Sequence, residues 1–431
     1  MLASPPYLPA LRILTALIGF LILPPSILHA QQGEPELSSE GLNVFLDLTS
    51  SWVDFDHLRR EIAFVNWMRD RQDAHLHILG TSQLTGSGGR EHTFYFIGLK
   101  TFTGRRDTLC YVEGSTETET ESRDGIVQIL KMGLMPYVAA TSVASRIRIS
   151  YTADRPGVSA GPTEDRWDWW VFAMSFHSFF NGQSHSSNGS YSGSLSANRT
   201  TEDSKYRMGI SSSYSRNSYE IPDVVEYVNT TRSLDASANA VWGLSPHWSA
   251  GFSGGLSQST YSNQTRLIRV GPAFEFNVFP YSESTRRELT WLYRIGPQWI
   301  EYEEETIFNK LEESVWQHAL IVSLDIKETW GSISISLDGS QYLHDTTLYS
   351  MGVYSSIDLR LFKGLSLNFS GGTSRIRDQL YISKAGLSTE EILLRRRALQ
   401  TDYDYFGMVG FSYRFGSIYN NAVNPRMGGV Y

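Results

Sequence analysis

The segment Tyr405-Phe-Gly-Met-Val-Gly-Phe-Ser-Tyr-Arg-Phe415 decides the fold of this chain. Successive side chains of a strand point to opposite faces, so the segment would have one large apolar face and one small or polar face. The two sets are Tyr405, Val409, Phe411, Tyr413 and Phe415, against Gly410, Ser412 and Arg414. Such a pattern is typical of a strand that lies between lipid and a polar interior.

The same alternation recurs through the C-terminal part of the chain and predicts an all-β transmembrane barrel of about twelve antiparallel strands over residues 166–416. The expected strands are 167–181, 187–200, 205–216, 226–244, 247–261, 266–279, 286–302, 315–329, 332–343, 348–362, 365–380 and 403–416.

The composition agrees with a barrel. Charged residues make up 19% of the 431 residues and aromatic residues 13%, while the mean hydropathy is only −0.25. A barrel exposes only alternate residues to lipid, so modest hydropathy is expected. The net charge of −8 argues against nucleic acid as a partner, because phosphate binding needs a basic surface.

The N-terminus carries the signals of export. Arg12 precedes an apolar stretch, and Ala30 precedes a polar segment, so we expect residues 1–30 to be a cleaved signal peptide. Cys110 is the only cysteine, which excludes an intrachain disulfide, and we expect it to be buried.

Residues 42–151 predict a separate small α+β domain, joined to the barrel by a linker over 152–165. We expect a strand over 43–48, a helix capped by Asp54 whose apolar spacing runs to Met68, and strands over 74–81, 93–99 and 108–112. A second helix over 122–140 and a last strand over 146–151 complete the domain. Its element order resembles that of TolB amino-terminal or CsgG-like periplasmic domains.

Two motifs in this domain suggest sites that we do not predict. The glycine-rich Thr85-Gly-Ser-Gly-Gly89 lacks the Lys-Ser/Thr of a phosphate-binding loop. His75 and His77 share a strand face, but no third ligand completes a metal site. We therefore expect no cofactor and no metal.

The connections predict which side each barrel end faces. Short turns at 245–246, 280–285, 330–331 and 363–364 alternate with long loops around 217–225, 303–314 and 381–402, and short turns are periplasmic in outer-membrane barrels. Ser388 and Glu391 form a capping box, so the last loop should contain a short helix. Aromatic residues near strand ends predict interfacial girdles: Trp242, Trp248, Tyr281, Trp291, Trp299, Trp316 and Trp330.

Alternation assigns eight charged residues to the lumen: Glu275, Arg294, Asp325, Lys327, Asp338, Asp358, Arg360 and Arg414. Mixed charges can line a narrow channel for small solutes, or they can pair and fill it. The sequence leaves both alternatives open.

Three motifs resemble segments of a group of exported bacterial outer-membrane barrel proteins. They are Phe64-Val-Asn-Trp-Met-Arg-Asp-Arg71, the glycine-rich 85–89 and the tail segment 417–426 within 417–431. The chain resembles this group over nearly its whole length, and the resemblance implies an outer-membrane barrel with a periplasmic N-terminal domain.

Three functional classes follow. One is a small-solute pore, and a second is an envelope anchor that binds outer-membrane lipids together with a periplasmic protein or peptidoglycan. The third is a lipid hydrolase, because twelve-stranded phospholipases, which this chain resembles in barrel size, use a His-x-Ser motif and an Asn. His185-Ser186-Ser187 has that spacing, with Asn198 downstream. We expect a non-enzymatic protein with no catalytic residues.

Overall fold

The computed structural model describes residues 41–48, 53–86, 88–150, 165–219, 227–385 and 400–421, which all belong to one compact unit, 38–431. The expected signal peptide, most of the expected linker and the capping box of Ser388 and Glu391 lie outside the described residues. No helix in the described part of the chain is long and apolar enough to span a membrane.

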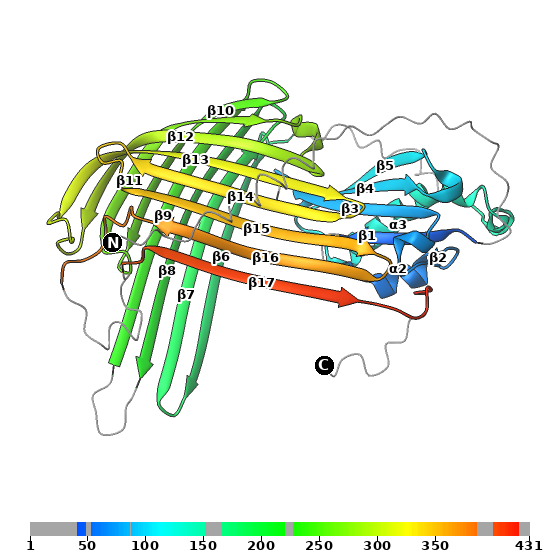
Figure 1. Ribbon diagram of the computed structural model, residues 1–431, viewed down its shortest axis with the longest axis horizontal. Helices are drawn as coiled ribbons and strands as arrows, with labels where there is room; N and C mark the ends of the chain where they lie inside the picture. Colours follow the sequence, from blue (N-terminus) through cyan, green and yellow to red (C-terminus); the bar gives the residue numbers. More distant parts are fainter. Residues whose placement is uncertain are drawn as a thin grey trace, which may run out of the picture. The chain divides into compact units, whose positions relative to one another are not determined.

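The N-terminal region is the expected α+β domain (Figure 1). Its sheet has the order β2-β1-β3-β4-β5, in which β1 is parallel to both of its neighbours and β3, β4 and β5 are antiparallel. The strands are β1 (Asn43–Leu48), β2 (Asn66–Trp67), β3 (Leu76–Leu84), β4 (Arg90–Gly98) and β5 (Arg106–Glu113). The helices are α2 (Phe55–Glu61) and α3 (Glu119–Val138), with short 3-10 turns η1 (Arg71–Asp73), η2 (Lys100–Phe102) and η3 (Ser142–Arg146).

Helix α2 starts where the sequence predicts and ends earlier. The side chain of Asp54 accepts a hydrogen bond from the His57 N–H at 2.9 Å, which caps the helix. The helix stops at Glu61, although the apolar spacing continues to Met68. The chain instead turns over 62–65 and then forms β2, a strand that the sequence pattern does not reveal because it is only two residues long.

Helix α3 begins three residues before the predicted start. A capping box between Thr118 and Glu121 fixes this start, and Pro136 lies inside the last turn of the helix. The predicted last strand over 146–151 is wrong as far as residue 150, where the description ends. Thr141 caps η3 instead, and residues 147–150 are irregular.

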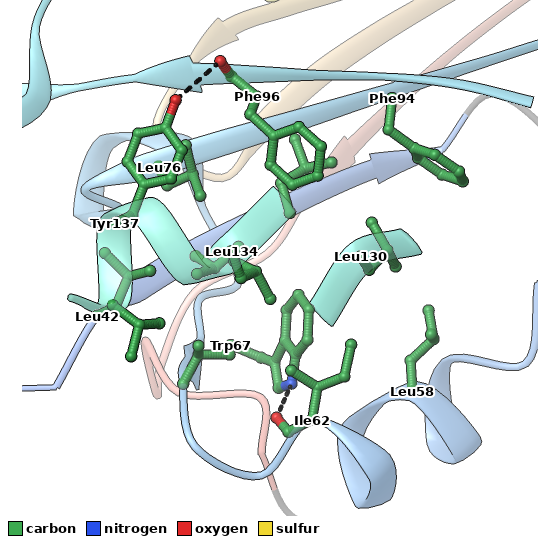
Figure 2. Packing of buried hydrophobic residues seen from close by; sticks show 14 of the residues in the cluster. Leu42, Leu58, Ile62, Trp67, Leu76, Phe94, Phe96, Leu130, Leu134 and Tyr137 are labelled. Atoms are coloured by element: carbon green, nitrogen blue, oxygen red, sulfur yellow. Dashed lines mark hydrogen bonds between the residues drawn. The ribbon is translucent and has the colours of Figure 1, made fainter. Parts of the chain in front are cut away.

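One dry core holds this domain together (Figure 2). Phe94 and Phe96 of β4 pack against Leu130 and Leu134 of α3, and all four side chains are almost fully buried. The Tyr137 hydroxyl donates to the Phe96 carbonyl at 3.3 Å and the Trp67 indole N–H to the Ile62 carbonyl at 3.2 Å, so these two buried donors are paired. Cys110, predicted to be buried, is exposed because it lies on the outer face of the edge strand β5.

The C-terminal part is an antiparallel sheet of twelve strands, and the predicted fold class and strand number are confirmed (Figure 1). The strands pair in chain order, β6 to β17. They are β6 (Trp170–Gln183), β7 (Ser186–Thr200), β8 (Ser204–Tyr219), β9 (Tyr227–Gly243), β10 (Trp248–Ser259), β11 (Gln264–Asn277), β12 (Arg287–Tyr302), β13 (Glu312–Glu328), β14 (Gly331–Tyr342), β15 (Tyr349–Phe362), β16 (Leu365–Ile376) and β17 (Tyr403–Tyr413). Among the described residues β6 and β17 do not pair, so the barrel is not closed.

One face of the sheet carries large exposed apolar side chains. Leu320 is 40% exposed, Trp316 53% and Phe411 80%, values that are unlike those of a packed core. On this face Trp248, Phe276 and Trp291 stand in one cross-strand row near one end of the sheet, while Trp299 and Trp316 lie towards the other. We call this face the apolar face.

Not every expected aromatic residue belongs to that face. Tyr281 lies in the turn η4 (Tyr281–Glu283), and its hydroxyl donates to Glu275 at 2.8 Å, so it contacts the opposite, polar face. In the deciding segment, Phe406 and Met408 also share the polar face with Gly410 and Ser412. Phe406 packs against the ring of Tyr354 there, with ring centroids 6.0 Å apart.

The two ends of the sheet differ in their connections. The links β7–β8, β9–β10, β11–β12, β13–β14 and β15–β16 form what we call the short-turn end, and the others form the long-loop end. The predicted alternation of short turns with long loops does not hold at β6–β7 and β10–β11. These links are short, 184–185 and 260–263, although they lie at the long-loop end.

Candidate functional site

The eight charged residues predicted to face a lumen lie on one face of the sheet. Cross-strand neighbours share a face, and the register can be followed from strand to strand. Glu275 pairs with Leu292 and Arg294 with Ala319, which places both charges on the polar face together with Asp325 and Lys327 of β13. Lys327 and Asp358 both pair with Ser332, so Asp358 is on the polar face as well. Asp338 and Arg360 share this face, because they lie an even number of residues from Ser332 and Asp358 on the same strands. Arg360 pairs with Ser366, Ser366 pairs with Ser412, and Arg414 follows two residues later. That this face lines a lumen remains a prediction.

Four of the eight charges gather at the short-turn end. Lys327, Asp358, Arg360 and Arg414 line a cavity of about 350 Å³ together with Asp47 of the α+β domain. Glu275, Asp325 and Lys327 form a second group with Glu288, which interacts electrostatically with all three. The remaining two charged residues belong to neither group. Arg294 lines a small cavity of about 80 Å³, and Asp338 lies against Gly352 of the neighbouring strand.

Asp47 connects the domain to the sheet. Its two carboxylate oxygens accept hydrogen bonds from both terminal nitrogens of Arg360, each at 2.5 Å, in a bidentate arrangement. The same carboxylate lies 3.3 Å from Nε2 of His77, a completely buried side chain of β3. Strand β1 thus presents one carboxylate between a buried imidazole and a guanidinium of the sheet.

The electrostatics of this triad favour a charged Asp47 and a neutral His77. Burial alone would raise the pKa of Asp47, but hydrogen bonds from His77 and Arg360 and the charge of Arg360 hold it below the usual value. Burial lowers the pKa of His77, and the nearby charges of Arg360 and Arg71 lower it further, against the opposing effect of Asp47. The ion pair therefore needs no proton on the histidine.

Two further contacts join the domain to the β15–β16 turn. The carboxylate of Asp70 accepts the backbone N–H of Gly364 at 2.7 Å, and Asp73 forms an ion pair with Lys363 at 2.6 Å. Gly364 has φ of 77°, and a Cβ there would lie 2.1 Å from the Arg414 carbonyl oxygen, so the turn requires glycine. Asp70 caps the short η1 and Asp73 is its last residue, so the conformation of η1 places both aspartates at the turn.

Further contacts reach other turns of the same end. The Tyr95 hydroxyl lies 3.1 Å from the Thr285 hydroxyl in the β11–β12 connection, and Arg286 stacks over the Tyr95 ring. Gly86 of the β3–β4 hairpin lies so close to Thr200, the last residue of β7, that a Cβ would approach its side chain to 2.6 Å. The domain therefore contacts the short-turn end at positions from β7 to β16.

The chain after β17 returns to the domain and extends its sheet. The Arg69 N–H donates to the Ile418 carbonyl at 2.9 Å, and the Asn420 N–H donates to the Trp67 carbonyl at 2.8 Å. Met68 and Tyr419 form an antiparallel bridge, and the Asn421 side chain accepts the Trp67 N–H at 2.6 Å. Residues 418–421 thus cover the free edge of β2.

A larger cavity of about 490 Å³ lies beside these contacts, and we call it the junction cavity. Its lining combines residues of the domain with residues of the β15–β16 turn and of the chain after β17. Five arginines and two aspartates line it, a net charge of +3: Arg59, Arg69, Arg71, Arg360, Arg414, Asp47 and Asp70.

The long-loop end has a small buried cluster of its own, formed by Ile300, Tyr302, Val315, Tyr342 and Leu380. The β16–β17 connection packs Leu380 against Tyr302 and Tyr342, which are both buried. The side-chain amide of Asn263 donates to the carbonyls of Glu304 and Tyr381, at 3.0 and 3.2 Å, and so ties three connections together.

The residues considered for catalysis or metal binding are not brought together. Ser187 and Asn198 lie on the same strand, eleven residues apart, a distance of about 36 Å at strand rise. His75 accepts a hydrogen bond from the Asn43 N–H, whereas His77 contacts Asp47. The described residues contain no group of three or more His, Cys, Asp or Glu side chains that would hold a metal ion.

The sequence predicted the residues that the sheet contributes to the site, but not those that the α+β domain contributes. Asp47 interrupts an otherwise apolar strand, while Asp70, Arg69 and Arg71 belong to the segment 64–71, which indicated only a resemblance to other exported proteins. The one available signal was their density of charge, because four of the five residues 69–73 are charged.

Comparisons with known proteins give little beyond this geometry. No family model and no curated protein matches the chain. Among solved structures, the NanC porin matches with 8% identity and a TM-score of 0.26, over 56% of this chain and 99% of that one. The translocator domain of the autotransporter NalP from Neisseria meningitidis matches with 12% identity and a TM-score of 0.27, over 57% of this chain and 88% of that one. TM-scores this low carry no argument, and the resemblance of the domain to TolB or CsgG-like domains remains a prediction.

Proposed function

We propose that this protein is a non-enzymatic outer-membrane β-barrel that passes small solutes, with its periplasmic opening covered by its own α+β domain. The observation that carries the proposal is the attachment of the domain to several turns of the short-turn end. The apolar face would meet lipid, the polar face would line the lumen, and the short turns would lie in the periplasm.

The chemistry of the contacts supports a cover that can move. The contacts are ion pairs and single hydrogen bonds, such as Asp47 with Arg360 and Asp73 with Lys363, rather than a shared apolar core. Polar contacts of this kind are typical of separable domain interfaces. A fixed anchor would gain more from apolar packing between the two parts.

Conductance of the purified full-length protein in planar bilayers tests the proposal. We expect low conductance for the natural sequence and more frequent opening for Asp47→Asn combined with Asp73→Asn, because these changes remove two contacts to the β15–β16 region. Asp56→Asn is the matched control, since the Asp56 side chain pairs with Arg59 within the domain and contacts no described residue of the sheet.

Electrophoresis of unboiled and boiled samples from outer-membrane fractions comes first. A faster unboiled band supports a closed barrel. Its absence would refute the membrane barrel, whereas a heat-modifiable protein that never conducts, with or without the substitutions, would refute solute passage and favour an envelope anchor.

A further inference from the structure

The junction cavity contrasts with the rest of the chain in its charge. The whole protein carries a formal charge of −8, yet the residues that line this cavity sum to +3. Like charges brought together around an empty space repel one another, and this repulsion is relieved when an anion binds.

Three of the five arginines form no ion pair with the described protein groups, although Asp70 also lines the cavity. Arg360 pairs with Asp47 and Arg59 pairs with Asp56. Arg69, Arg71 and Arg414 form no ion pair within the described part of the chain, and Nε of Arg69 is buried without a hydrogen-bond partner. These three come from different places: Arg69 and Arg71 flank Asp70 at the start of η1, and Arg414 follows β17.

We propose that the junction cavity binds a small phosphate-bearing anion that has an apolar part. Guanidinium groups offer forked donors that match phosphate oxygens, and these three arginines suit a ligand with two or more negative charges. A volume of about 490 Å³ is in the range of small-molecule sites. Phe55 and Phe362 line the same cavity and are 36% and 58% exposed, so they provide a surface for the apolar part.

The anion site is a property additional to the proposed solute passage, and its existence does not depend on that function. The cavity is bounded by the domain, the β15–β16 turn and the chain after β17, so its occupant would touch both parts of the protein at once. A bound anion would therefore strengthen the attachment of the domain to the sheet.

Two sources share this chemistry, a soluble phosphate ester and a phospholipid head group. Isothermal titration of the full-length protein in a nonionic detergent distinguishes them. One arm titrates phenyl phosphate, with phenol as the uncharged control, and the other titrates phosphatidylglycerol in mixed micelles, with phosphatidylcholine as the comparison.

We expect saturable binding of one phosphate ligand per chain and none of phenol. Arg69→Gln and Arg414→Gln should each weaken binding by about tenfold, as expected for the loss of one charge-assisted hydrogen bond. Arg375→Gln is the control, because Arg375 is an exposed arginine of β16 towards the long-loop end, and it should bind normally.

Binding of phenyl phosphate identifies a soluble ester site, and binding of phosphatidylglycerol alone identifies a head-group site. Absence of binding in both arms overturns the proposal, as does binding that Arg69→Gln and Arg414→Gln leave unchanged. Heat-modifiability of each variant shows that the sheet is folded, so a failure here is separate from a failure to conduct.

Discussion

The α+β domain and the twelve-stranded sheet use apolar residues in opposite ways. In the domain, Leu76, Phe96 and Leu134 are fully buried against one another. In the sheet, Met174 and Phe411 are each about 80% exposed, as is Phe415 just after β17, whereas Gly410 and Ser412 lie on the other face. A protein that leaves so much apolar surface uncovered needs a nonpolar solvent there, whereas the domain is complete in water. The two parts of the chain are therefore suited to two different environments.

Phe96→Ala should have the largest effect and should be confined to the domain. A fully buried phenylalanine replaced by alanine typically costs about 3–5 kcal/mol in the free energy of unfolding, through lost burial and the cavity that remains. Urea unfolding followed by limited proteolysis measures this loss, while heat-modifiability of the sheet should persist. Val112→Ala, at a side chain 58% exposed, is the control and should change little. If both variants behaved alike, the domain would not be a separately packed unit.

Leu320→Arg should have the second-largest effect, and it should destabilise only the sheet. Leu320 lies near the middle of β13 on the apolar face, where an arginine in lipid costs about 2–4 kcal/mol. Unfolding in detergent or lipid, followed by gel mobility, gives the measurement. Ser334→Arg on the polar face, opposite Asp325, should be tolerated. Equal destabilisation by the two changes would contradict the assignment of faces.

The stability of the domain should fall as the pH decreases below about 6.5. The pKa of His77 is lowered in the folded state, so below 6.5 the unfolded chain binds more protons, and stability is lost by at most about 1.4 kcal/mol per pH unit. The contribution is complete above pH 6.5. Asp47, with its pKa lowered from 3.8, adds a further loss only in more acidic solution.

Unfolding of the domain between pH 5 and 8 tests the histidine. His77→Gln should flatten the dependence, and His185→Gln, at an exposed turn of the sheet, should leave it unchanged. An identical slope in all three proteins would show that His77 is not the responsible group.

The smallest effect should come from the contact that joins the two regions. Asp47→Asn and Arg360→Gln, tested singly and together, should show a coupling energy of about 1 kcal/mol, because Arg360 is 37% exposed and water screens the pair. Hydrogen exchange at the β15–β16 turn and in β1 reports the coupling. Fully additive effects would mean that the two regions fold and move independently.

Much of the fold could be read from the sequence because its signals are local. Alternation at period two predicted twelve strands to within a few residues of their ends, and Asp54 predicted the start of α2. The failures were also local. The apolar spacing from Phe55 to Met68 is the same whether the chain stays helical or turns into β2, so tertiary packing decided where α2 ended.

The candidate site, like the fold, could be predicted from the sequence only in part. Strand alternation assigns Lys327, Asp358, Arg360 and Arg414 to one face, since it depends only on sequence parity. Only the tertiary structure pairs Asp47 with Arg360 across 313 residues, and only it folds residues 418–421 onto the edge of β2. The sequence determined which residues share a face because that property follows from strand periodicity. The junction cavity was decided by the tertiary structure, because it depends on contacts between segments that nothing in their local sequence brings together.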